Sequence, residues 1–78
     1  MVERSALLDE YGYEIEIDDG TDYLHFYYTN IIDTENPNLL RFDPLYELGH
    51  DIDRKLSGQT VMIPYVRVMK VSKKKEAE

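Results

Sequence analysis

Apolar and polar residues alternate along two short runs on either side of Asp19-Gly20. An Asp-Gly pair between such runs is a strong hairpin signal, because both residues tolerate the positive φ of a tight turn. The pattern therefore predicts a β-hairpin over Tyr11–Tyr28 with a two-residue turn. In that register three apolar pairs share one face: Tyr11 with Tyr28, Tyr13 with Phe26, and Ile15 with Leu24.

The opposite face of this predicted hairpin is acidic and rich in tyrosine. It carries Glu14, Glu16, Tyr23, His25 and Tyr27. Tyrosines exposed on a sheet serve as anchors for partner proteins, whereas the carboxylates would repel the phosphates of nucleic acid. The alternative is that another element covers this face. We expect a non-enzymatic interaction or regulatory module that binds a partner protein, or a second copy of itself, at this face.

The segment 43–56 carries a helical pattern. Apolar residues recur there at steps of three and four: Leu45, Leu48, Ile52 and Leu56. Asp43-Pro44 supplies a capping carboxylate and a proline suited to the first helical turn. Gly49 and the like-charged pair Glu47 and Asp51 disfavour a helix. The periodicity nevertheless predicts a helix that packs on the hairpin.

Shorter signals complete the predicted α+β fold, a small, mainly antiparallel sheet built on the N-terminal hairpin with one helix packed on it. A short helical segment is expected over residues 5–10 and a short strand over 39–42, after a turn-forming segment at 33–38. Residues 60–71 are rich in β-branched side chains and form the last strand, which Pro64 interrupts or places at an edge.

Length and composition narrow the class of protein. The chain has 78 residues, no cysteine and a formal net charge of −7. We expect one domain over residues 1–71 and a charged, disordered tail over 72–78. The lack of cysteine excludes disulfides and thiolate-bound metals. No apolar run approaches the roughly 20 residues of a membrane span, so the prediction is a soluble cytoplasmic protein with no cofactor and no membrane contact.

Catalytic and metal-binding arrangements are weakly indicated. In the predicted register His25 faces Glu14, but none of the hydroxyls of Thr21, Thr29 and Ser57 lies in a nucleophile motif. Asp18, Asp19 and Asp22 surround Gly20 too closely for a calcium loop, and turn formation explains them without a metal. We therefore predict neither an enzyme nor a metal site.

Two stretches in the second half carry a family resemblance. They are Glu47-Leu48-Gly49-His50, and Ile63-Pro64-Tyr65-Val66-Arg67 followed by Val68-Met69-Lys70-Val71. Together they resemble the C-terminal half of a small, mainly archaeal domain family proposed to recognise RNA ends carrying cyclic phosphates. Where that family usually has histidine before the arginine, this chain has Val66.

The resemblance implies a second possible function for the chain. It implies an accessory domain that binds RNA ends through His50, Tyr65, Arg67 and Lys70. It also implies a turn or strand at 47–50, in place of the helix that the periodicity predicts. Independently of the resemblance, the basic side chains near the end of the chain can neutralise phosphates without reading sequence.

Overall fold

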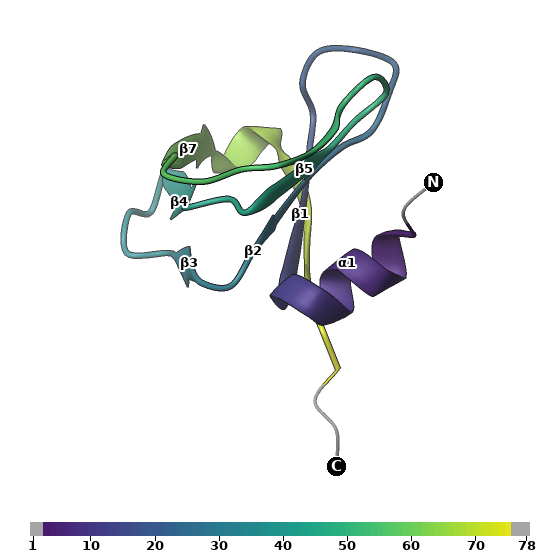
Figure 1. Ribbon diagram of the computed structural model, residues 1–78. Coiled ribbons are helices and arrows are strands. Elements are labelled where there is room, and N and C mark those ends of the chain that lie inside the picture. Colours follow the sequence, from purple (N-terminus) through teal and green to yellow (C-terminus); the bar gives the residue numbers. More distant parts are fainter. Residues whose placement is uncertain (1–2, 76–78) are drawn as a thin grey trace.

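The computed structural model describes residues 3–75 and has an α+β fold (Figure 1). One helix precedes a series of short strands, and a single 3₁₀ turn interrupts their end. In chain order the elements are α1 (Arg4–Tyr11), β1 (Tyr13–Ile17), β2 (His25–Thr29), β3 (Ile32–Asp33), β4 (Leu39–Phe42), β5 (Tyr46–Leu48), β6 (Asp53–Lys55), β7 (Val61–Pro64), η1 (Tyr65–Arg67) and β8 (Val68–Lys73). Within residues 3–75, no helix has the length and apolar character needed to cross a bilayer.

The strands form two antiparallel sheets. The larger sheet has five strands in the order β6-β5-β2-β1-β8, and the smaller has three in the order β3-β4-β7. The segment from β7 through η1 to β8 joins the two sheets. The last strand thus closes the larger sheet beside β1.

Both faces of the larger sheet are covered, each by a different layer. One face packs on the smaller sheet through Ile15, Ile17, Leu40, Phe42 and Ile63. The other packs on α1 through Leu7, Phe26, Tyr28 and Tyr46. Figure 1 shows α1 against β1 and β2, on the side away from β3, β4 and β7. The expectation of a mainly antiparallel sheet with a helix packed on it is therefore confirmed, although that helix is α1.

The hairpin is present, but its predicted register is wrong. Ile15 pairs with Tyr27, and Glu16 pairs with Phe26. The strands are joined by a loop over residues 18–24 instead of a two-residue turn. The partner of each β1 residue is displaced by an odd number of positions, and such a displacement moves every β2 side chain to the other face.

The reason for the longer loop lies in Ile17 and in the side chains that follow it. Ile17 is buried in the core, so β1 continues to that residue. Beyond it the carboxylate of Asp18 accepts a hydrogen bond from the amide of Gly20 at 2.9 Å, and that of Asp19 accepts one from the amide of Thr21 at 3.0 Å. These local turns fold the loop back on itself. Gly20 has the expected positive φ of 85°.

The predicted helix over 43–56 is also wrong. That segment forms β5 and β6, which pair with each other, and β5 adds to β2. Tyr46 points to the face under α1, whereas Glu47 points to the other face, where His25 and Arg54 bond it. As a strand, the segment buries Tyr46 under α1 and gives the Glu47 carboxylate its two partners. In a helix, Gly49 and the like-charged pair Glu47 and Asp51 would be unfavourable.

Other expected elements are present. The short N-terminal helix and the strand over Leu39–Phe42 are both found. The last strand breaks at Pro64 into β7 and β8, as proline at that position indicates. β8 ends at Lys73, two residues beyond the end predicted for the last strand. Of the predicted disordered tail, residues 76–78 lie outside the described part of the chain.

Candidate functional site

The acidic, tyrosine-rich face expected from the sequence is not one surface. Glu14 and Glu16 share the face that α1 covers, because they pair with Tyr28 and Phe26. His25 and Tyr27 lie on the opposite face, paired with Ile17 and Ile15. Tyr23 lies in the loop over residues 18–24. The corrected register is the cause of this division.

Glu14 lies in a structural network beneath α1. It is 5% exposed, and Arg4 donates to both of its carboxylate oxygens, at 2.8 and 3.3 Å. The Tyr28 hydroxyl donates to the same carboxylate at 2.6 Å. Burial favours a raised pKa for Glu14, but the bonds from Arg4 and Tyr28 outweigh it and hold the pKa below its ordinary value. Glu14 therefore ties the helix to the sheet and is not open to a partner.

His25 lies between two carboxylates on the other face. Its ring is buried, with Nε2 at 2.8 Å from Oε2 of Glu47 and Nδ1 at 3.2 Å from Oδ2 of Asp19. The predicted pairing of His25 with Glu14 is therefore wrong. Arg54 holds the other oxygen of Glu47 at 2.9 Å. Burial, followed by the nearby Glu47 carboxylate, raises the pKa of Tyr27 to about 12.

Within residues 3–75, the hydrogen-bond partners of the His25 ring are carboxylates, and no serine or threonine hydroxyl bonds to it. Thr21 donates its hydroxyl to Asp19 at 2.7 Å. The Thr29 hydroxyl lies 3.1 Å from the carbonyl oxygens of both Ile31 and Asp43, which share its single proton. The hydrogen bonds from Thr21 are the main reason that the pKa of Asp19 falls to about 2. The described residues also contain no group of three or more acidic or histidine ligands placed to hold a metal ion.

A groove opens where the loop over 18–24 meets the turn between β5 and β6. Figure 1 shows this loop and this turn projecting together beyond the sheet. Tyr23 and His50 stack there with ring centroids 3.7 Å apart and an interplanar angle of 16°. The groove has a volume of about 760 Å³ and is lined by Arg4, Asp22, Tyr23, Leu24, Phe26, Leu48, Gly49, His50, Asp51, Ile52 and Asp53.

The groove combines an apolar floor with an acidic rim. Tyr23 and Leu24 are 54% and 51% exposed. The rim carries Asp22, Asp51 and Asp53, all of them exposed. The guanidinium of Arg4 lies 4.0 Å from the centre of the Phe26 ring and is bonded to Glu14. The groove therefore presents aromatic and aliphatic surface surrounded mainly by negative charge.

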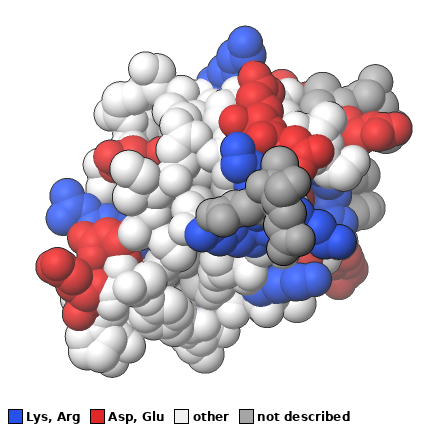
Figure 2. All heavy atoms as spheres, turned by 90° about the horizontal axis from the view of Figure 1, so that it is seen from below, with Lys and Arg blue, Asp and Glu red and all other residues white. Residues whose placement is uncertain are grey.

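The residues implied by the family resemblance fall in two places. Tyr65, Arg67 and Lys70 are exposed along η1 and β8. Arg67 donates its Nε to the carbonyl of Asp18 at 3.0 Å. His50 lies beside Tyr23 at the β5–β6 turn, and β2 and β1 separate β5 from β8. Figure 2 shows Lys and Arg side chains interspersed with Asp and Glu on the face seen from below.

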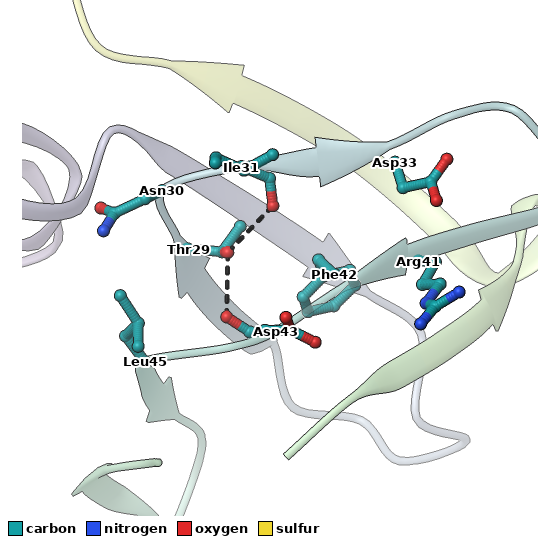
Figure 3. A pocket seen from close by; sticks show the side chains of 8 residues that line it. All are labelled: Thr29, Asn30, Ile31, Asp33, Arg41, Phe42, Asp43 and Leu45. Atoms are coloured by element: carbon teal, nitrogen blue, oxygen red, sulfur yellow. Dashed lines mark hydrogen bonds between the residues drawn. The ribbon is translucent and has the colours of Figure 1, made fainter. Parts of the chain in front are cut away.

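A second hollow lies where β2 ends, beside β3 and β4 (Figure 3). It has a volume of about 450 Å³ and is lined by Thr29, Asn30, Ile31, Asp33, Arg41, Phe42, Asp43 and Leu45. In Figure 3 the Thr29 hydroxyl is occupied by its bonds to the carbonyls of Ile31 and Asp43. The hydroxyl thus links the end of β2 to the segment before β5.

The chain matches no family model, no curated protein and no solved structure. The site therefore rests on its own geometry. Sequence reasoning singled out Tyr23 and His50 separately, for different partners, and did not connect them. It missed Glu47 as the partner of His25, and Arg54 as the partner of Glu47, because the helical pattern at 43–56 concealed a strand over Tyr46–Leu48.

Proposed function

We propose that this protein is a small non-enzymatic interaction module that binds a partner protein through the groove beside Tyr23 and His50. The observation that carries the proposal is the half-exposed Tyr23 ring, stacked on His50 above apolar side chains. Tyrosine rings of this kind supply large contact area at a low cost in conformational entropy, and they are enriched among the dominant residues of protein interfaces.

The rim of the groove determines the chemistry of the partner. Asp22, Asp51 and Asp53 favour a basic segment, and the apolar floor favours an aliphatic or aromatic anchor within it. Arg4 does not cancel this preference, because Glu14 already pairs with its charge. The partner is therefore a protein segment in which lysine or arginine residues flank an apolar side chain.

Two matched synthetic peptides test this proposal. Both carry a central tryptophan, flanked by lysines in one peptide and by glutamates in the other. We expect the lysine peptide alone to shift the NMR signals of Tyr23, Leu24 and His50. Tyr23→Ala should weaken binding by about tenfold, the usual scale for an aromatic interface anchor.

Tyr65→Ala is the control, because Tyr65 is also an exposed tyrosine but lies on η1, away from the groove lining. It should leave the binding of the lysine peptide unchanged. If neither peptide shifts the groove signals, or if both bind equally well, the proposed function is wrong.

A second candidate function is recognition of RNA ends by the basic C-terminal segment. The specific observation that favours it is the exposed run of Tyr65, Arg67 and Lys70 along η1 and β8. An exposed ring beside cations can stack on a base while the cations neutralise phosphates. His50 takes no part in this surface, since it belongs to the groove.

Short RNAs that end in a cyclic phosphate or in hydroxyl groups distinguish this candidate from the first. Titrations at several salt concentrations should show binding that weakens with salt and prefers the cyclic-phosphate end. Arg67→Gln should weaken this binding, whereas Tyr23→Ala should not. Absence of salt-dependent binding would exclude the RNA function.

A further inference from the structure

The buried His25 ring contacts both of the segments that form the groove. Asp19, which faces Nδ1, belongs to the loop that carries Tyr23. Gly49 belongs to the turn that carries His50, and a side-chain carbon added there would lie 3.8 Å from Nδ1. The ring therefore bonds the loop that carries Tyr23 and lies close to the backbone of the turn that carries His50.

Only the charged form of histidine can donate hydrogen bonds to both carboxylates at once. An ionised carboxylate only accepts hydrogen bonds, and a neutral imidazole has one N–H and one unprotonated nitrogen. Both ring nitrogens of His25 face carboxylate oxygens, at 2.8 and 3.2 Å. A neutral ring would place a lone pair against one of these carboxylates. The observed arrangement thus fits the imidazolium, which donates to both.

The two carboxylates are not equivalent. Glu47 is buried and is fixed by Arg54, and its contact with His25 is the shorter one. Asp19 is more exposed, lies in a loop and makes the longer contact. Loss of a proton should therefore leave the N–H on Nε2, where Glu47 accepts it, and remove the donor that faces Asp19.

We propose that His25 is a protonation-controlled latch for the groove: the charged ring holds the loop over 18–24 through Asp19, and the neutral ring releases it. Released, the loop no longer keeps Tyr23 stacked on His50. The effect on partner binding rests on the proposed function above, whereas the movement of the loop does not depend on it.

Charged and titratable groups face the His25 ring from several elements. Asp19 stays ionised because its pKa is about 2, and Tyr27 on β2 stays neutral because its pKa is about 12. Glu47 on β5 is paired with Arg54 on β6, and Arg67 on η1 acts on Tyr27 from the far side. Ile17, opposite His25 on β1, carries no charge.

NMR of the full chain tests the latch without any ligand. The ring nitrogens of His25 report its protonation, and the ring protons of Tyr23 and the amides of Gly20 and Thr21 report the loop. We expect the loop signals to change with the same midpoint as His25. The measurement should be repeated in His50→Phe, which keeps a ring beside Tyr23 and removes the other titrating histidine.

Asp19→Asn is the decisive variant. A carboxamide can accept a bond from the charged ring or donate one to the neutral ring, so the loop signals should lose their pH dependence while His25 still titrates. Asp18→Asn is its matched control, because the Asp18 carboxylate accepts its bond from the amide of Gly20; this variant should retain the pH dependence.

Two results would overturn the latch: loop signals that do not change as His25 titrates, or a pH dependence that survives in Asp19→Asn. If the loop moves, affinity for the lysine peptide should fall by at least about fivefold on deprotonation, the low end of typical coupling between sites. Movement of the loop without any peptide binding would support the latch and reject the proposed function.

Discussion

Glu14 and Glu47 are equally buried, at 5% exposure each, and lie on opposite faces of the same sheet. Each pairs with one arginine and one ring-bearing donor. For Glu14 these are Arg4 and the hydroxyl of Tyr28, and for Glu47 they are Arg54 and the imidazole of His25. The two networks contain the same kinds of group and differ in the ring donor, which is a tyrosine hydroxyl in one and a histidine imidazole in the other.

The Tyr28 hydroxyl keeps its proton under all ordinary conditions, because burial and the Glu14 carboxylate raise its pKa. The network under α1 is therefore permanent. Histidine can gain or lose charge near neutral pH, and His25 is the donor that reaches a loop. Both networks reach the groove, the first through Arg4 and the second through the loop that carries Asp19, but only the second contains a histidine.

The largest expected effect comes from breaking the permanent network. Glu14→Ala leaves the Tyr28 hydroxyl buried without its acceptor and separates Arg4 from its partner. We expect the free energy of unfolding to fall by about 3 kcal/mol, the cost of removing one member of a buried pair. Urea denaturation measures this change. Glu10→Ala, at an exposed position of α1, is the control and should change little.

Removal of single hydroxyl groups sharpens the same comparison. Tyr28→Phe should lower the free energy of unfolding by about 2 kcal/mol, because a hydrogen bond to a charged group is lost. Tyr27→Phe, on the neighbouring residue of β2, should cost less, since Tyr27 is only partly buried whereas Tyr28 is fully buried. Equal losses in the two variants, measured by urea denaturation, would contradict the assignment of the permanent network to Tyr28.

The pH dependence of stability separates the networks further. Because the pKa of Glu14 is lowered from 4.5, its ionised form stabilises the fold above that pH, and this stability is lost as acid protonates the carboxylate. Ionised Asp19 adds stability that is lost as the pH falls from 3.8 to about 2. Tyr27 acts at the alkaline end, where its stabilisation is lost as pH rises from 10.0 to about 12.

Thermal unfolding across pH should therefore show losses at both extremes. Glu14→Gln should reduce the acid loss, and Tyr27→Phe should reduce the alkaline loss and leave the acid loss unchanged. An acid loss of the same size in Glu14→Gln would show that other carboxylates cause it.

The smallest effect on stability is expected at the groove. Tyr23→Ala should change the free energy of unfolding by less than about 1 kcal/mol, because the ring is half-exposed and its stack with His50 is a weak contact in water. Urea denaturation beside the peptide titration checks this. A much larger loss would mean that Tyr23 is part of the core instead of a binding surface.

Local patterns predicted the parts of the fold that depend on local chemistry. The strand at Leu39–Phe42, the break at Pro64 and the positive φ of Gly20 follow from turn and strand preferences of neighbouring residues. The predicted hairpin register would place the apolar Ile17 opposite the charged Asp22, and this mismatch indicates a longer loop. The length of this loop depends on hydrogen bonds from backbone amides to the carboxylates of Asp18 and Asp19, which the apolar–polar pattern does not reveal.

The site required contacts between distant segments. The apolar residues around Glu47 have the spacing of a helix. Pairing with β2 instead gives Glu47 a strand position in which His25 and Arg54 bond its carboxylate. Tyr23 and His50 meet because β5 pairs with β2, and no local signal around either ring indicates that pairing. Tertiary hydrogen bonding thus overrode an apolar periodicity at 45–56 and created the groove.

The pairing of β1 with β8 has a consequence for how this chain folds. Tyr13 lies opposite Lys73, so an early strand is completed by one that is synthesised much later. Until β8 arrives, β1 exposes a hydrogen-bonding edge to the other chains around it. Contacts of such long sequence separation slow folding, because the ends of a long loop must meet first. We therefore expect folding to finish only after β8 has left the ribosome, with β1 the segment most exposed to aggregation until then.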